Sequence, residues 1–272
     1  MDILFDLTGK VIVITGGGGV LGSAVAADLA RAGAKVVLLG RREEPLVRVA
    51  SRIAAEGGAA LPLSCNVLER QELQKARDRI VAQWGPADIL INGAGGNNKA
   101  ATTSAELPVF DIPVEAIRQV MDLNLIGAIL PTQIFARDMA SRGSGVILNV
   151  SSMNAFRPLT KVPVYSAAKA AVSNFTQWLA VHVCQTCSPR IRVNAIAPGF
   201  FLTEQNRFLL TDEKTGDLTP RGRSIIDHTP MARFGAPEDL LGTVRWLISD
   251  AAQFVTGIVV PVDGGFSAFG GV

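Results

Sequence analysis

The chain has 272 residues, of which 48% are hydrophobic and 18% charged, and its formal net charge is +2 at pH 7. This composition excludes intrinsic disorder and suits a globular protein with a buried sheet. Because no basic run occurs, nucleic acid is not expected as a partner. No apolar run approaches the roughly 18 residues of a membrane span. The N-terminus lacks the positive charge of a signal peptide, so we expect a cytoplasmic protein without membrane attachment.

The three cysteines indicate neither a disulfide framework nor a metal site. Cys184 and Cys187 form a single CxxC, and the histidines of the chain are His182 and His228. A structural zinc site would need two more ligands at a matching spacing. We therefore expect no metal.

A strand, a glycine-rich loop and a helix open the chain. Residues 10–15 (KVIVIT) and 35–40 (KVVLLG) are short apolar runs, and GGGGVLG at 16–22 leads from the first into an alanine-rich helical pattern. This order predicts one right-handed βαβ unit. Its glycines fit GxGxxG, which lets the backbone approach a pyrophosphate at the positively polarised helix N-terminus. The unit therefore predicts a dinucleotide site.

The residues after the second strand bear on the choice of dinucleotide. An NAD site usually carries an acidic residue there, which binds the ribose 2′-hydroxyl. Here Gly40 is followed by Arg41 and Arg42, and the first carboxylate is Glu43. A guanidinium suits a 2′-phosphate, whereas the alternative is that both arginines are solvated. We expect NADP(H) to be preferred, with NAD(H) as the alternative.

The remaining sequence repeats the alternation of strand and helix. Seven strands predict an α/β chain in which residues 1–272 form a single doubly wound Rossmann-type domain with a seven-stranded parallel sheet. The polar stretch at about 200–236 is predicted to be an irregular substrate loop. The further strands are predicted at 60–64, 88–91, 145–150, 190–197 and 257–262, and the further helices at 43–57, 68–84, 113–141, before about 185, and at 237–249.

The stretch SMNAFRPLTKVPVYSAAK carries the candidate chemistry. Tyr165 and Lys169 are four residues apart in a predicted helix, so they share one face, and a nearby ammonium favours the phenolate. Ser152 ends a strand-like run and can hydrogen-bond the same reacting oxygen. Asn124 interrupts an apolar helix and is either a structural bridge or part of the site, because a buried amide needs partners. The alternative for Tyr165 and Lys169 is an ordinary surface pair.

Seven motifs in a fixed order give the chain a family resemblance from Lys10 to Gly265. They are TGGGGVLG, NGAG, Asn124, Ser152, YxxxK, PGFFLT and VDGG. Together they resemble the short-chain dehydrogenase/reductase family. The stretches INGAGGN, TPMARFG and VDGGFSAF are similar to its D-mannonate oxidoreductase (fructuronate reductase) subgroup. The resemblance implies a homotetramer with the helix at 237–249 and the VDGG strand at interfaces.

The resemblance also implies a role for each catalytic residue. Tyr165 would be the general acid that protonates the carbonyl oxygen, and Lys169 would lower the tyrosine pKa and hold the nicotinamide ribose. Ser152 would orient the carbonyl, and Asn124 would support a water linked to Lys169. Beyond Tyr165 and Lys169, the implied cofactor contacts are Gly16, Gly18, Gly19, Leu21, Arg41, Asn66, Val67, Asn92, Ala94, Gly95, Pro198, Gly199, Phe200 and Thr203.

Two residues depart from the family pattern. Val20 stands in place of the middle glycine of TGxxxGxG, which bears on the local backbone. Asn66 replaces the usual aspartate that accepts from the adenine amino group, although its amide oxygen can still accept.

The resemblance names a small polyhydroxy acid as the substrate, with the interconversion of D-mannonate and D-fructuronate as the leading case. Such a site should be polar and carry a cation for the carboxylate. Polar residues occur in three loops, including Asn97 and Asn98, and the predicted substrate-binding residues are Asn154, Lys161 and Arg207. The alternatives are a reductase of another carbonyl compound, such as a 3-oxoacyl thioester or gluconate, and a catalytically idle dinucleotide-binding module.

Overall fold

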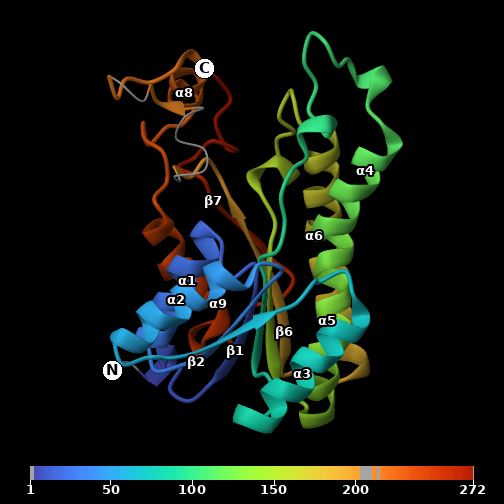
Figure 1. The fold of residues 1–272 in the computed structure, drawn as a ribbon, viewed down its shortest axis with the longest axis vertical. Coiled ribbons are helices and arrows are strands. Elements are labelled where there is room, and N and C mark those ends of the chain that lie inside the picture. Colours follow the sequence, from blue (N-terminus) through green and yellow to red (C-terminus); the bar gives the residue numbers. More distant parts are fainter. Residues whose placement is uncertain (1–2, 203–209, 213–214, 272) are drawn as a thin grey trace.

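The computed structural model describes residues 3–202, 210–212 and 215–271. Within these residues, seven strands form one parallel sheet in the order β3-β2-β1-β4-β5-β6-β7, which confirms the predicted single Rossmann-type α/β domain (Figure 1). The strands are β1 Val11–Thr15, β2 Lys35–Gly40, β3 Ala59–Ser64, β4 Ile89–Asn92, β5 Gly145–Val150, β6 Ile191–Pro198 and β7 Val259–Val262.

Helices cover both faces of the sheet. In Figure 1, α1, α2 and α9 lie on one side, and α3 to α6 lie on the other. Each side has its own apolar core, with Leu29 and Leu247 fully buried in the first and Leu73 and Phe135 in the second. The helices are α1 Val20–Arg31, α2 Glu43–Ala55, α3 Arg70–Trp84, α4 Val114–Met121, α5 Gly127–Arg142, α6 Pro163–Thr186, α8 Pro220–Asp227 and α9 Leu241–Ile248.

The strand order reverses next to β1, which pairs with β2 on one side and β4 on the other. Ligands of open α/β sheets bind at such a switch point, beyond the carboxyl ends of the strands. Here those ends are Thr15 and Asn92, which are partners in the β1–β4 register. The Thr15 hydroxyl accepts hydrogen bonds from the backbone N–H groups of Gly93 and Ala94 at 3.1 and 3.0 Å. The turn after β4 is thereby fixed to β1.

The helix predicted at 113–141 is present, but it is not regular throughout. Between α4 and α5 the segment Asp122–Ile126 forms a π-helical turn, with Asn124 buried in its middle. Single π turns inside α-helices occur mostly at functional sites. The sequence pattern does not show this turn, because it follows from contacts that Asn124 makes with a distant loop.

The prediction of an irregular stretch at 200–236 is wrong for residues 220–227, which form α8. The hydroxyl of Thr219 accepts from the backbone N–H of Gly222 at 3.0 Å, and Pro220 occupies the first helical position. Both are ordinary helix-start signals. The helix predicted at 237–249 is also divided, into a 3-10 turn at Pro237–Leu240 and then α9. None of the helices described above is long and apolar enough to cross a membrane.

Candidate active site

The three residues predicted to act on a carbonyl group lie together at the carboxyl end of β5. Tyr165 and Lys169 are one turn apart on α6, with the Lys169 Nζ atom 5.6 Å from the centroid of the tyrosine ring. Ser152 follows β5 and begins the 3-10 turn Met153–Ala155, where its hydroxyl accepts from the backbone N–H of Asn154 at 3.3 Å. The Ser152 side chain also hydrogen-bonds Tyr165.

The Lys169 ammonium is the most deeply buried charge of this group, with the residue 4% exposed. Its Nζ atom donates to the Val150 carbonyl at 2.8 Å. Burial disfavours the charged form, and it lowers the pKa of Lys169 to about 8. The backbone of Gly95 approaches closely, since a Cβ atom there would lie 3.1 Å from Nζ and 2.8 Å from the Asn124 Oδ1 atom. Only glycine fits this position.

Asn124 joins the π turn to the loop after β4. Its Nδ2 atom donates to the carbonyls of Gly96 at 2.7 Å and Val120 at 2.8 Å, and its Oδ1 atom accepts from the Gly96 N–H at 3.2 Å. The amide is therefore a structural bridge, and the same contacts hold Gly95 against Lys169. Of the two interpretations that the sequence leaves open, these bonds show the structural bridge, and a role of Asn124 in the site stays a prediction.

That Lys169 lowers the pKa of Tyr165 stays a prediction. Burial raises the pKa of the Tyr165 hydroxyl and outweighs the hydrogen bond with Ser152, which lowers it. The Lys169 ammonium is bonded to the Val150 carbonyl rather than to the phenol. Tyr165 therefore holds its proton at neutral pH, as a proton donor requires.

A cleft of about 640 Å³ lies at the carboxyl ends of β1, β2 and β4. Eight of the residues predicted to bind a cofactor line it: Gly16, Gly18, Gly19, Leu21, Arg41, Val67, Ala94 and Gly95. Four more lining residues belong to motifs that the sequence analysis related to a dinucleotide, namely Gly22, Gly40, Arg42 and Gly93. The sequence analysis missed Pro45, Leu46, Cys65 and Leu123.

The glycine loop in this cleft fits a dinucleotide. A Cβ atom at Gly16, where φ is +73°, would lie 2.8 Å from the Gly93 carbonyl oxygen, and one at Gly22 would collide with the Gly16 carbonyl. Gly19 caps α1 without any side-chain hydrogen bond, so the helix N-terminus is left for an anionic ligand. Val20, which replaces a family glycine, is simply the first residue of α1. Backbone rather than side chains thus forms the floor of the cleft.

Two asparagines predicted to contact the cofactor have other roles. The Asn92 side chain is buried and donates to Thr132 Oγ1 at 3.0 Å and Asn149 Oδ1 at 2.9 Å, so it joins β4 to α5 and β5. The amide oxygen of Asn66 accepts from the Leu68 N–H at 3.2 Å. Neither side chain lines the cleft. The Asn92 amide bonds side chains in the interior, and the Asn66 amide bonds the backbone two residues further along the chain.

The segment after β6 contacts other cavities. Pro198 ends β6 and Gly199 follows it, packed against Asp263. Phe200 lines two cavities outside the dinucleotide cleft. Thr203 and Arg207, which were predicted to bind cofactor and substrate, lie outside the described residues.

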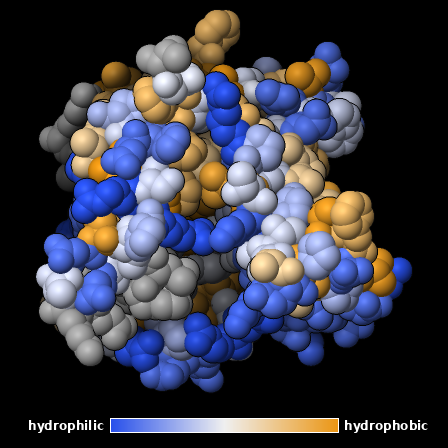
Figure 2. Space-filling model, turned by 90° about the horizontal axis from the view of Figure 1, so that it is seen from above, coloured by the Kyte–Doolittle hydropathy of each residue, from blue (hydrophilic) through white to orange (hydrophobic). Residues whose placement is uncertain are grey.

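One of these cavities, here called the α8 cavity, has a volume of about 510 Å³ and lies between α8 and the loop before α6. Lys161, a predicted substrate residue, is in its wall and lies four residues before Tyr165 in the chain, just outside α6. Figure 2 looks down on this end of the molecule and shows a hollow with hydrophilic residues around its rim and hydrophobic residues deeper inside. The lining residues are Leu159, Thr160, Lys161, Val162, Phe200, Arg221, Ser224, Ile225, His228 and Phe266.

Among the other predicted substrate groups, Asn154 is 4% exposed, and its side chain has no hydrogen-bond partner among the described residues. Its backbone N–H bonds the Ser152 hydroxyl, which places the Asn154 residue directly beside Ser152. Asn97 and Asn98 are different, because their amides bond Thr102 and Gln119 at 2.8 and 2.6 Å and shape their own loop.

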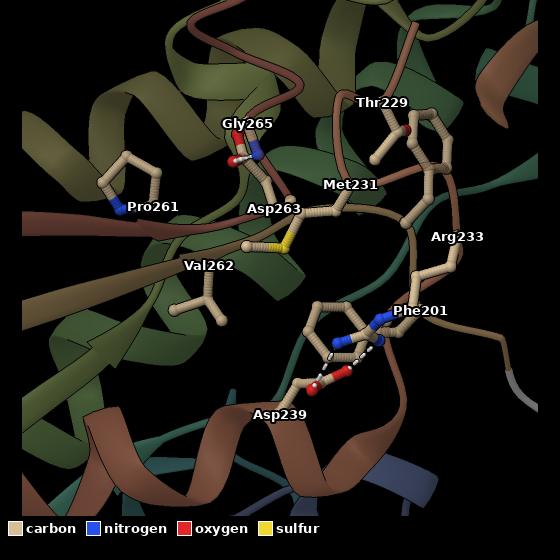
Figure 3. Close-up of a pocket in the computed structure, with 12 residues that line it drawn as sticks. Phe201, Thr229, Met231, Arg233, Asp239, Pro261, Val262, Asp263 and Gly265 are labelled. Carbon is tan, nitrogen blue, oxygen red and sulfur yellow. Dashed lines mark hydrogen bonds and ion pairs between the residues drawn. The ribbon is translucent and has the colours of Figure 1, made fainter. Parts of the chain in front are cut away.

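A further cavity of about 360 Å³ lies on the other side of Phe200 (Figure 3). Arg233 closes one end of it through two hydrogen bonds to the Asp239 carboxylate, at 2.6 and 2.9 Å. Phe201 forms a bridge with Gly235 nearby. This cavity contains none of the catalytic residues, and its wall positions the segment that carries Phe200.

The described residues contain no group of three or more His, Cys, Asp or Glu side chains placed to hold a metal ion. The Tyr165 and Ser152 hydroxyls, the buried Lys169 and the glycine-lined cleft thus lie at the carboxyl ends of the strands.

Comparison with known proteins agrees with this arrangement. The family model of the short chain dehydrogenases matches residues 10–214. The chain belongs to the short-chain dehydrogenase family. It is therefore an NAD(P)-dependent oxidoreductase that acts on alcohol groups, and the predicted family is confirmed.

This dehydrogenase is similar to the uncharacterized oxidoreductase UxuB of Bacillus subtilis, with 49% identity over 276 residues and 98% of each chain covered. A crystal structure assigned as a D-mannonate oxidoreductase from Haemophilus influenzae, with bound NAD, has a TM-score of 0.93 and 48% identity, and covers 98% of each chain. A gluconate 5-dehydrogenase from Burkholderia cenocepacia, in complex with NADP and tartrate, has a TM-score of 0.85 and 32% identity, also over 98% of each chain.

We predict that Lys169→Met stabilises the ligand-free dehydrogenase below pH 8 while abolishing turnover. The pKa of about 8 for Lys169 in the folded protein lies below the ordinary lysine pKa of 10.5. Burial of the Lys169 charge therefore reduces the free energy of unfolding by its full amount below pH 8. The reduction decreases between pH 8 and about 10.5, and it is absent above pH 10.5. The lost hydrogen bond to Val150 reduces the gain equally at every pH.

The measurement is the free energy of unfolding of both proteins from pH 6 to 10.5, at one protein concentration and without cofactor. Lys75→Met, which changes an exposed lysine on α3, is the control. A difference between wild type and Lys169→Met that stays constant across this range would contradict the assigned burial cost.

Proposed function

We propose that this dehydrogenase interconverts a secondary alcohol and a ketone on a sugar acid, with D-mannonate and D-fructuronate as the leading pair. The observation that carries the proposal is the α8 cavity, where the cation Lys161, four residues before Tyr165 in the chain, lies in a wall and no carboxylate of the described residues lines the space. An acid substrate fits such a cavity better than a neutral one does. The similarity to structures assigned to mannonate and gluconate oxidoreduction supports the same class.

The proposed mechanism assigns the reacting oxygen to Ser152 and Tyr165. A bound nicotinamide supplies the hydride to the carbonyl carbon in reduction and accepts it in oxidation. The Ser152 hydroxyl orients the carbonyl oxygen, and the Tyr165 hydroxyl donates the proton that completes the alcohol. Lys169, protonated for the most part at neutral pH, places a positive charge beside the phenolate that is left.

The rest of the chain holds the substrate in place. Asn154 lies next to Ser152 and its side chain makes no hydrogen bond within the described residues, so it is free to bond a substrate hydroxyl. The Gly95 backbone, held through the bonds of Asn124 to Gly96, lies close to the buried ammonium of Lys169.

A second candidate is a reductase of 3-oxoacyl thioesters. The observation that favours it is the apolar part of the same cavity, formed by Leu159, Val162, Phe200, Ile225 and Phe266. A linear acyl chain would pack against this surface. The cation in the wall has no role in that case, and a charge-dependent preference among substrates separates the two candidates.

For the cofactor, NADP(H) remains our proposal, with NAD(H) as the alternative. Arg41 and Arg42 both line the dinucleotide cleft beyond β2, and neither has an ion-pair partner among the described residues. The relative from Haemophilus influenzae contains NAD, whereas the one from Burkholderia cenocepacia contains NADP. Assembly as a homotetramer and a cytoplasmic location also remain proposals. The exposed Trp178 and Val181 on α6 offer an apolar surface for assembly.

We predict that Arg41→Ala lowers kcat/KM with NADPH and leaves the value with NADH nearly unchanged. A charge-assisted contact to the 2′-phosphate is worth on the order of 1.5–3 kcal/mol. The measurement is the ratio of kcat/KM for the two cofactors in wild type, Arg41→Ala and the control Arg79→Ala, which removes an exposed arginine on α3. Equal efficiency of the two cofactors in wild type, or an unaltered ratio in Arg41→Ala, would refute the preference.

We predict that the wild-type enzyme reduces D-fructuronate far more efficiently than D-fructose, which differs from it by a CH₂OH group in place of the carboxylate. Lys161→Met should raise KM for the acid and spare the neutral ketose, because only the charged contact is lost. A panel that includes a 3-oxoacyl thioester tests the second candidate. If neutral ketones are reduced as well as any ketoacid, the sugar-acid proposal fails while the family assignment stands.

A further inference from the structure

One face of α8 forms a wall of the α8 cavity. Its four lining residues are Arg221, Ser224, Ile225 and His228, spaced i, i+3, i+4 and i+7 along the chain. Residues at this spacing share one face of a helix. Arg221 therefore projects from the same face as residues that line the substrate space, in the first turn of α8.

Arg221 has no acidic partner. No hydrogen bond or ion pair joins its side chain to the described residues, and the same is true of Lys161 across the cavity. Two other arginines near this end of the molecule are engaged: Arg233 bonds the Asp239 carboxylate, and Arg157 donates to the Ser267 carbonyl at 3.0 Å. No Asp or Glu of the described residues lines the α8 cavity. Within the described part of the chain, two unpaired cations therefore share a space without an anion.

The position of Arg221 is fixed by the way α8 packs. Gly222 is buried, and a Cβ atom there would collide with the Leu210 carbonyl oxygen. Ile225 is 7% exposed and its carbonyl accepts from the buried Thr229 hydroxyl at 2.7 Å. A helix anchored through these residues fixes the backbone position from which the exposed Arg221 side chain reaches the cavity wall. The planar guanidinium can bind a carboxylate with two parallel hydrogen bonds.

We propose that Arg221 and Lys161 together bind the carboxylate of the substrate, which lies at the end of the substrate remote from the reacting ketone. This inference rests on the proposed sugar-acid function and adds a specificity residue to it. In D-fructuronate the ketone is at carbon 2 and the carboxylate at carbon 6. On this proposal, a substrate whose ketone lies at Ser152 and Tyr165 extends past Val162, which lines the α8 cavity, and its carboxylate lies between α8 and the loop before α6.

The test compares Arg221→Gln with the control Arg223→Gln, which removes the same charge from the same helix at an exposed position outside the cavity. Arg221→Gln should raise KM for D-fructuronate by about 10- to 100-fold, the value of one charge-assisted contact. It should leave kcat/KM for D-fructose within about twofold of wild type, because the neutral ketose makes no such contact. Arg223→Gln should change neither the KM for D-fructuronate nor the kcat/KM for D-fructose. Arg221→Lys should have a KM for D-fructuronate between those of Arg221→Gln and wild type.

A double-mutant cycle with Lys161→Met shows whether the two cations bind one carboxylate. If they do, the two losses are not additive, because residues that share a partner are energetically coupled. Equilibrium binding of D-fructuronate in a Tyr165→Phe background measures the same losses without turnover.

The outcomes separate this inference from the function on which it rests. If the wild-type enzyme prefers D-fructuronate and Arg221→Gln has the same KM for this acid as wild type, Arg221 is not a carboxylate ligand and the proposed function stands. If Arg221→Gln lowers the efficiency with D-fructose as much as with the acid, its effect is structural and the inference is wrong. If wild type shows no preference for the acid, the proposed function fails and the carboxylate site fails with it.

Discussion

The catalytic arrangement depends on a buried ammonium group. An isolated charge removed from water is costly, and a protein usually neutralises it or surrounds it with polar groups. Lys169 shows both responses, since its pKa is lowered to about 8 and its Nζ atom bonds the Val150 carbonyl. The glycine at position 95 allows the backbone after β4 to come close enough to share that environment. Much of the local structure follows from this requirement.

The π turn in the long helix is part of the same solution. Asn124 bonds both carbonyl and N–H of Gly96, so the loop that contacts Lys169 is held by an amide from a different element. Thr15 fixes the beginning of that loop from β1. The switch point of the sheet thus supplies both the dinucleotide cleft and the support of the catalytic lysine, which explains why the two lie side by side.

On this proposal, the two ends of the substrate bind to different parts of the fold, one in the core of the domain and one in a segment inserted between two strands. Tyr165 belongs to α6, and Ser152 follows β5, which is an inner strand of the sheet. Arg221 belongs to α8, a short helix inserted between β6 and β7 and placed above β7 in Figure 1. Function resides in sites added to a fold. One catalytic core can therefore act on different substrates when only the inserted helix and its neighbouring loop change.

Most of the fold and the catalytic set could be predicted from local patterns. Buried parallel strands are continuous apolar runs, and Tyr165 and Lys169 have a helical spacing, so both are visible in the sequence. What was missed depends on contacts between distant residues. The π turn requires the Gly96 loop, Asn92 is directed to Thr132 and Asn149, and the pKa of Tyr165 depends on how deeply the ring is buried. The signals for α8, Thr219 and Pro220, were present but lay within a polar stretch without apolar periodicity.

The measurement that tests the account most directly is the turnover of Tyr165→Phe with D-fructuronate, together with equilibrium binding of the cofactor. The substitution keeps the ring and removes only the hydroxyl that donates the proton. The account predicts that kcat falls by at least about 10²-fold, while the dissociation constant of NADPH stays close to that of wild type. A variant that retains nearly normal kcat would show that the proton comes from another group, and the assignment of Tyr165 as the general acid would have to be abandoned.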